Sequence, residues 1–281
     1  LTFKANKKLE FTDLFRYEEI SQKKIKKEQI TQAIKMAEKW YFNHVDPETG
    51  MIEHIYYPSE NSYGKKDDHI GQMGAAFALL RAKELTKNKQ NYYLVRRTLD
   101  YYLGFLIDFK AQSLIKAGEV NSKNAVFVLL DGKAKLSYNA FLLYSLVKMK
   151  DYPNQKNLVK ALAEGILKQQ EKNGSYKTYF ACTQKTEVDY YPGEAMLSLL
   201  LVYESTKKKV YLNSVSKAFL YYRDYWRKNR NMAFVPRHSQ VYSKLYGYTK
   251  KQELAQFVFE MNDWLIKNHQ IKQHRYKDLI G

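Results

Sequence analysis

An internal repeat constrains the fold of this chain more than any other feature of its sequence. Residues 74–86 align with residues 194–206 without a gap, so that Thr86 coincides with Thr206. In both copies a short lysine-rich segment follows, and then a second stretch with helical periodicity. The repeated unit is therefore predicted to be a helical hairpin, in which a tight turn joins two helices.

Two further copies of the unit are weaker. One comprises residues 238–249 and the helix predicted over 252–267, and the other comprises residues 137–150 and the helix predicted over 157–170. A helix predicted over 26–43 has no hairpin partner of its own. When this helix is included, the sequence predicts between four and five hairpins.

The two helices of each unit differ in character. Residues 75–85 and 195–202 are apolar nearly all round, which is typical of a buried helix. The second helices are apolar on one side only, as Leu94 and Leu99 illustrate. Each hairpin can bury its apolar face only against neighbouring hairpins. We therefore expect an all-α protein, an α/α toroid, closed or incomplete, of about four to five hairpins with inner and outer helices. A straight solenoid is the alternative.

The connections also alternate in length. Those from an inner to an outer helix are short, whereas those from an outer to the next inner helix are long. The long connections contain residues typical of short strands or extended segments. These segments are 51–57, 125–130, 175–180 and 232–235. We expect one domain over 1–281, with an N-terminal extension over 1–25.

Composition excludes several classes of protein. Of the 281 residues 45% are hydrophobic, and Gly and Pro are few, which excludes a disordered chain and argues against an all-β fold. No apolar run approaches the roughly 18–20 residues that span a bilayer. Cys182 is the single cysteine, so we expect no internal disulfide and no cysteine-based metal cluster. The histidines show no metal-ligand spacing and no metal-binding or phosphate-binding motif occurs, so we expect no metal site and no cofactor. The first residue is not Met, and we expect a soluble, exported protein or one part of a larger chain.

The chain is strongly basic, with 47 Lys and Arg against 29 Asp and Glu and a net charge of +18. Such a charge fits a nucleic-acid partner, an anionic polymer or a lysine-rich solvated surface. The sequence contains no zinc-finger spacing, basic zipper or RNA-binding aromatic motif. We therefore expect no specific recognition of nucleic acid.

Polar residues gather just before the predicted inner helices. If these helices run parallel, their N-termini and the long loops meet at one end of the protein, where the helix dipoles favour anionic groups. The residues concerned are Asp67, Asp68, His69, Asp131, Lys133, Lys135, Glu187, Asp189, Tyr190, Tyr191, Glu194, Arg237 and His238.

The tandem hairpins, together with residues 189–195 that open an inner helix, resemble the six-hairpin glycosidase-like superfamily of α/α toroids. Glycoside hydrolases, polysaccharide lyases and sugar epimerases belong to that superfamily. The resemblance implies an active cleft at the loop end of the helices, built from acidic residues, His, Tyr and stacking aromatics. Most members have six hairpins on a longer chain.

Three acidic residues are candidates for catalysis. Asp68 is a possible acid or base, and the alternative is that it caps the helix that follows. Glu194 follows Pro192 in the first helical turn, where a carboxylate suits the dipole, but the apolar run after it points this side chain inward. An inward carboxylate needs a partner or a substrate, so we assign a catalytic role to Asp189 or Glu194.

The remaining candidates are basic, polar or aromatic. His238 is a candidate base and Arg237 a candidate partner for a uronate carboxylate, although a lone His is more often a hydrogen-bonded structural residue. Asn139 lies one turn into its helix and is a candidate polar contact. The remaining predicted substrate-binding residues are Asp67, His69, Tyr190 and Tyr191.

These observations predict a glycan-processing enzyme, most simply a glycoside hydrolase that acts through paired carboxylates. The predicted catalytic residues are Asp68, Asp189, Glu194 and His238. One alternative is a lyase or epimerase of uronate polysaccharides that moves a proton with Tyr or His. Another is a basic helical scaffold without enzymatic activity, which binds a protein or an anionic polymer.

Overall fold

The computed structural model describes residues 2–3, 11–12, 26–53, 55–64, 68–180 and 186–271, and most of these residues are helical. The α-helices are α1 (Lys27–Asn43), α2 (His69–Thr86), α3 (Gln90–Tyr102), α4 (Leu136–Lys148), α5 (Gln155–Lys168), α6 (Tyr191–Thr206), α7 (Lys209–Lys228), α8 (Phe234–Thr249) and α9 (Gln252–Leu265). The strands are β1 (Thr2–Phe3), β2 (Phe11–Thr12), β3 (Tyr56–Tyr57), β4 (Ser62–Tyr63), β5 (Leu106–Asp108) and β6 (Val126–Val128), which form three antiparallel pairs. The prediction of an all-α protein with short strands in its loops is confirmed.

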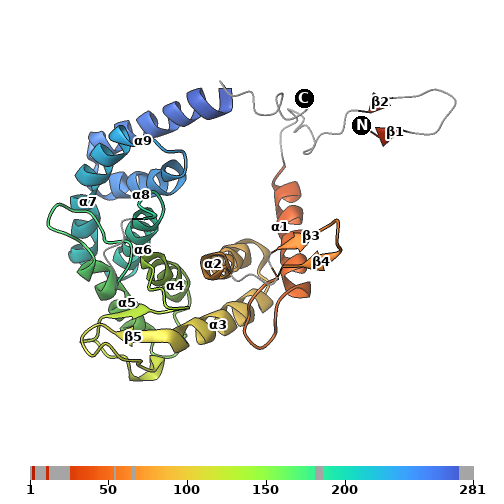
Figure 1. Cartoon of the computed structure of the whole chain (residues 1–281), viewed down its shortest axis with the longest axis horizontal. Coiled ribbons are helices and arrows are strands. Elements are labelled where there is room, and N and C mark those ends of the chain that lie inside the picture. Colours follow the sequence, from red (N-terminus) through yellow and green to blue (C-terminus); the bar gives the residue numbers. More distant parts are fainter. Residues whose placement is uncertain are drawn as a thin grey trace.

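Four helical hairpins, α2–α3, α4–α5, α6–α7 and α8–α9, form a curved array (Figure 1). Helices α2, α4, α6 and α8 pack against one another on the inside of the arc, and their partners lie outside. Helix α1 packs against α2 as the helix without a hairpin partner. In Figure 1 the arc is open between α9 and α1, so a closed toroid is not seen among the described helices.

Burial explains the difference between inner and outer helices. Every residue of α4 from Leu136 to Val147 is buried, because this helix is covered by α2, α5 and α6. In α5 the buried residues, such as Leu158, Leu162 and Ile166, recur on one face. Burying one such aliphatic side chain stabilises the fold by about 1.5–3 kcal/mol.

The repeated Thr-Lys sequence ends three of the inner helices. Helices α2, α6 and α8 each end at a Thr whose hydroxyl donates a hydrogen bond to the carbonyl four residues earlier. The next residue, Lys87, Lys207 or Lys250, adopts the left-handed conformation with φ of 56–59° and closes the helix. The inner helix can then reverse within two or three residues. We call this end of the array the turn end.

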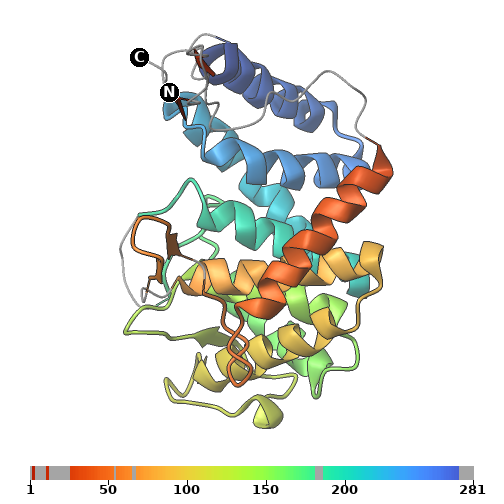
Figure 2. The same cartoon turned by 90° about the vertical axis from the view of Figure 1, so that its right-hand side faces the viewer.

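The long connections meet at the opposite end of the inner helices, the loop end, on the left in Figure 2. Strands occur in two of the predicted segments, as β3 and β6. Residues 175–180 contain isolated bridges at Tyr176 and Tyr179, with bends between and after them. The prediction of a strand or extended segment over 232–235 was wrong, because residues 232–233 form a turn and α8 begins at Phe234. Pro236 lies in the first turn of α8, where its missing N–H has no intrahelical acceptor.

The N-terminal part of the chain contributes α1. Glu38 of α1 is buried and accepts hydrogen bonds from Thr86 and Asn91, which joins α1 to the first hairpin. Apart from β1 and β2, the predicted extension 1–25 lies outside the described residues. Among the helices that the structure describes, none has the length and apolar character needed to cross a membrane.

Candidate functional site

Side chains from three hairpins meet at the loop end, where α2, α4 and α6 begin. We call this group the rim cluster. It consists of Asp68, His69, Tyr102, Asp131, Tyr138, Tyr179 and Tyr191. These residues lie far apart in the sequence and are brought together because the inner helices start at the same end of the array.

His69, the first residue of α2, is the best-connected member of the cluster. Its Nε2 lies 2.9 Å from the Asp131 carboxylate, and its Nδ1 lies 3.2 Å from the Tyr102 hydroxyl. The His69 side chain is only 11% exposed, whereas Asp131 is 81% exposed on a tight turn. The Asp131 carboxylate and the Tyr102 hydroxyl, one on each ring nitrogen, fix the orientation of the imidazole.

Three tyrosines extend the cluster from His69 towards α6. The ring of Tyr138 lies edge-on to His69 at 6.2 Å, and the rings of Tyr179 and Tyr191 are 6.0 Å apart. Burial, together with the nearby Asp131 carboxylate, raises the pKa of Tyr138 to about 12. Burial likewise raises the pKa of Tyr191. Both phenols are therefore protonated at neutral pH.

Asp68 precedes α2 and is exposed. It occupies the N-cap position, but its side chain makes no capping hydrogen bond. The carboxylate instead folds over Gly71, where a Cβ atom would lie 2.5 Å from Oδ2. Asp68 is close enough to raise the pKa of Tyr138 electrostatically, which places it beside the cluster. Asp67 lies outside the described residues.

Glu194 lies one helical turn after Tyr191 on α6. The residue is 8% exposed, and burial raises the pKa of its carboxyl group to about 8, although the positive charge of Arg237 acts in the opposite direction. Its Oε2 is buried and has no hydrogen-bond partner among the described residues. Glu194 is therefore a protonated carboxylic acid at neutral pH.

Arg237 of α8 approaches Glu194 over an aromatic surface on α4. Its guanidinium lies 6.0 Å from the Phe141 ring and 5.8 Å from the Tyr144 ring. Gly193 makes this approach possible, since a Cβ atom there would lie 2.9 Å from Arg237 Cγ. The guanidinium places a fixed positive charge beside a protonated acid.

Asp189 faces away from the rim cluster. Asn231 donates a hydrogen bond of 2.8 Å to its Oδ2, and the Tyr225 hydroxyl lies beside the same carboxylate. Burial raises the pKa of Asp189. This side chain thus ties the start of α6 to α7 and α8. Tyr190 next to it is 48% exposed and free to stack, whereas Tyr191 is buried.

His238 and Asn139 are completely buried. The His238 ring stacks on Phe234 at 3.3 Å and bonds its carbonyl through Nδ1, and burial lowers the pKa of His238 to about 3. The Asn139 amide donates to the carbonyls of Val126 and Leu162, joining β6 to α4 and α5. Neither side chain has a face open to a substrate. These placements favour packing roles for both residues.

Sequence reasoning missed the aromatic members Tyr102, Tyr138 and Tyr179. One signal was present, since the doublet 101–102 recurs at 221–222, and Tyr222 likewise lies 5.7 Å from a histidine, His238. The tyrosine of each doublet that faces inward therefore contacts a histidine at the start of an inner helix. Tyr138 and Tyr179 carry no comparable signal, because tyrosine is frequent throughout this chain.

No protein-family model and no curated protein matches the chain. Within the described part of the chain, no three His, Cys, Asp or Glu side chains come together in a way that could hold a metal ion. Cys182 lies outside that part. The groups at the loop end that could take part in chemistry are those of the rim cluster and Glu194.

Proposed function

We propose that this protein is a glycan-processing enzyme, and most simply a glycoside hydrolase in which Glu194 is the general acid. The observation that carries this proposal is the buried Glu194 carboxyl, whose pKa is raised to about 8. Glycoside hydrolysis needs a carboxylic acid that is still protonated at working pH, so that it can protonate the leaving oxygen. Ordinary glutamates are ionised at neutral pH and cannot donate this proton.

The second carboxylate that hydrolysis requires is assigned to Asp68. Asp68 is exposed just before α2 and acts electrostatically on Tyr138, which in turn acts on Tyr191. Glu194 lies one turn beyond Tyr191, about 5 Å further along α6. Asp68 and Glu194 thus belong to the same end of the array but come from different hairpins, as groups on opposite sides of a glycosidic bond would.

The arrangement of the hairpins is compatible with this proposal. Inner helices that begin at a common loop end, with acidic and aromatic residues gathered there, are what the resemblance to the six-hairpin glycosidase-like superfamily implies. We propose that the curved array is part of an α/α toroid of this kind. The rim cluster would then lie at the end where that superfamily places its active cleft.

The test is turnover of a panel of neutral and uronate glycans by the wild-type protein and by Glu194→Gln and Asp68→Asn variants. We expect each variant to lose about 10²–10⁴-fold in turnover, the range for removal of a general acid or base. Wild-type turnover should fall as the pH rises through about 8, because Glu194 then loses its proton. Glu164→Gln on the outer helix α5 is the control and should retain wild-type turnover. Unchanged turnover in both variants would exclude the hydrolase, and absence of turnover on every glycan would favour the non-enzymatic scaffold.

A lyase or epimerase of uronate polysaccharides is the second candidate, and the His69–Asp131 pair favours it. Such an enzyme removes the sugar C5 proton with a base and neutralises the uronate carboxylate with a cation. His69 would be the base and Arg237 the cation. An unsaturated product would identify a lyase, and solvent deuterium incorporated at C5 would identify an epimerase. If His69→Gln abolishes this reaction and Glu194→Gln does not, the reaction is assigned to the rim cluster.

A further inference from the structure

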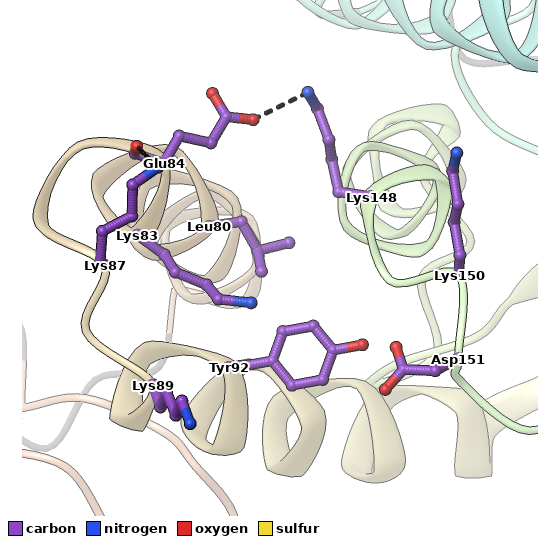
Figure 3. A pocket seen from close by; sticks show the side chains of 9 residues that line it. All are labelled: Leu80, Lys83, Glu84, Lys87, Lys89, Tyr92, Lys148, Lys150 and Asp151. Carbon is purple, nitrogen blue, oxygen red and sulfur yellow. Dashed lines mark hydrogen bonds and ion pairs between the residues drawn. The ribbon is translucent and has the colours of Figure 1, made fainter.

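The turn end of the array, opposite the rim cluster, contains two hollows lined by lysines. The first has a volume of about 760 Å³ and lies between α2, α3 and α4 (Figure 3). The second, of about 480 Å³, lies between the α4–α5 and α6–α7 hairpins. Lys150 lines both hollows, so they form one continuous surface. We call this surface the turn-end basic surface.

The charge of this surface is strongly positive. Its lining contains eight lysines and two carboxylates, a net of +6 out of the +18 of the chain. One of the carboxylates, Glu84, is already paired with Lys148 at 2.9 Å and with Arg81 at 3.4 Å. In Figure 3 the ammonium groups of Lys83 and Lys148 stand around the opening, with Tyr92 and Asp151 beneath them. The surface therefore presents positive charge that internal ion pairs leave largely uncompensated.

Lysines at the ends of the inner helices have a structural explanation, because cations stabilise a helix C-terminus. The lysines at the start of the outer helices have no such structural explanation. Lysine is no capping residue, and a cation at a helix N-terminus opposes the dipole. Three outer helices nevertheless have a lysine at the N-cap without a capping hydrogen bond from its side chain: Lys89 of α3, Lys208 of α7 and Lys251 of α9. A lysine also occupies the N-cap of α1 (Lys26) and, at the loop end, that of α4 (Lys135).

A lysine also occupies the first turn of the outer helix α5. Asn154 is the N-cap of α5, but Lys156 occupies the second helical position and lines the second hollow. Each of these lysines lowers the stability of its own helix. Three of these lysines, Lys89, Lys156 and Lys208, line the two hollows, and a local rule that is broken repeatedly around one surface indicates a function of that surface.

We propose that the turn-end basic surface binds an acidic polysaccharide, separately from the rim cluster. A polymer fits better than a single anion, because the lysines extend over two joined hollows and three hairpins. Lysines without arginines in the lining attract carboxylates as point charges and lack the fork that recognises one phosphate. Single-stranded nucleic acid would need open aromatic faces, but Lys83 covers the Tyr92 ring at 4.2 Å and Tyr211 is buried.

The choice of a polysaccharide rests on the proposed function, which supplies the reason for holding such a chain. Helix α6, with 16 residues, separates its two ends by about 24 Å, so a polymer on this surface would not occupy the position of Glu194. The surface would instead retain the substrate near the enzyme between rounds of reaction.

The experiment measures binding of fluorescent polygalacturonate, with dextran as the neutral probe and single-stranded DNA as the competing polyanion. The variant replaces Lys89, Lys150, Lys156 and Lys208 with Gln. The matched control replaces four exposed lysines elsewhere, Lys39, Lys110, Lys172 and Lys228, so that both variants carry a net charge of +14. We expect the turn-end variant to bind polygalacturonate at least about 10-fold more weakly, with a shallower dependence on salt, and the control to stay within about 2-fold of wild type.

Equal losses in the two variants would overturn the proposal, because the attraction would then come from the net charge alone. Stronger binding of DNA than of polygalacturonate, or no binding of polygalacturonate, would also overturn it. The Glu194→Gln variant should bind the polymer as wild type does. The two proposals can fail separately. If Glu194→Gln loses turnover but the wild-type protein does not bind polygalacturonate, the binding surface is refuted and the proposed function stands. If the wild-type protein binds polygalacturonate but turns over no glycan, only the proposed function is refuted.

Discussion

Helix α6 carries a glutamate near each end, and the two are held in opposite protonation states at neutral pH. At the loop end, burial raises the pKa of Glu194 to about 8. At the turn end, burial of Glu204 is outweighed by hydrogen bonds from Lys244 and Tyr248, which hold its pKa below the ordinary value. The helix dipole alone would make the pKa of Glu194 the lower of the two, because the positive end of the dipole is at Glu194. Burial and direct partners therefore decide the charge of a helix-terminal carboxyl here.

At the turn end, ion pairs link neighbouring inner helices directly, whereas the carboxyl of Glu194 at the loop end has no such pair. Lys148 of α4 bonds Glu84 of α2, and Lys244 of α8 bonds Glu204 of α6. Lys148 also lowers the pKa of Glu204 electrostatically, so charges of alternating sign follow one another from α2 to α8. We call this row the ion ladder. At the loop end Glu194 keeps a buried oxygen without a partner among the described residues, which is unfavourable for stability and useful for proton transfer.

The largest expected effect is the dependence of stability on pH that Glu194 causes. The pKa of Glu194 rises from 4.5 to about 8 on folding, so the folded state binds one more proton between these values. Stability is therefore highest at low pH and is lost as the pH rises towards 8, by several kcal/mol at about 1.4 kcal/mol per unit. His238 acts in the opposite direction, because its pKa falls from 6.5 to about 3 and its stabilisation is lost as the pH falls below about 6.5.

Together the two groups predict maximal stability between about pH 4.5 and pH 6.5, where their slopes cancel. Chemical denaturation at a series of pH values measures this profile. In Glu194→Gln the decline between pH 6.5 and pH 8 should disappear, and in the control Glu164→Gln it should remain. A decline that persists in Glu194→Gln would show that this carboxyl is already ionised in the folded protein.

The next largest effect is expected from substitution of two glycines, Gly193 at the loop end and Gly247 at the turn end. A Cβ atom at Gly193 would lie 2.9 Å from both Arg237 and His238, whereas a Cβ atom at Gly247 would have no atom within 4 Å. Gly193→Ala should therefore lower the free energy of unfolding by about 1–3 kcal/mol, as overpacking does. Gly247→Ala lies in the open part of α8 and should raise it by about 0.5–1 kcal/mol through better helix propensity. Thermal and urea unfolding of both variants test this, and the same sign of change in both would contradict the close approach of α6 and α8.

The smallest effect concerns the ion ladder. Lys244→Gln removes the partner of Glu204 and should lower the free energy of unfolding by less than about 1 kcal/mol, since both side chains are one-third exposed. The loss should shrink in roughly 1 M salt, where the Debye length is about 3 Å. Lys228→Gln removes an exposed lysine outside the ladder and is the control. A loss of several kcal/mol in Lys244→Gln would mean that the ladder, and not core packing, stabilises the turn end.

Much of the fold could be predicted from the repeat. The Thr-Lys pair at the end of residues 74–86 and 194–206 marked the helix ends correctly, because the backbone reverses through a left-handed lysine at Lys87 and Lys207. Closure of the array could not be predicted in this way. The curvature depends on small rotations between neighbouring hairpins, and the sequence pattern of one hairpin does not contain them.

The candidate site was less accessible to sequence reasoning. The polar residues before each inner helix do lie at the loop end, and Asp68, His69 and Tyr191 meet there. However, α4 is buried along nearly its whole length, so its sequence does not reveal that Asn139 faces β6 and α5. Only tertiary packing determines that His238 is buried, that Glu194 approaches Arg237 and that Asp189 turns towards Asn231.

The order of the contacts along the array also has a consequence for how the protein unfolds. The principal contacts of each inner helix are with its own hairpin partner and with the next inner helices on either side. Because each hairpin is stabilised mainly by its immediate neighbours, unfolding can begin at one end of the array and proceed hairpin by hairpin. Amide hydrogen exchange should then be slowest in α4 and α6, which have neighbours on both sides, and faster towards α1 and α9. Since α4 and α6 supply Tyr138 and Glu194, the slowest-exchanging part of the molecule would also be the part that holds the centre of the loop end.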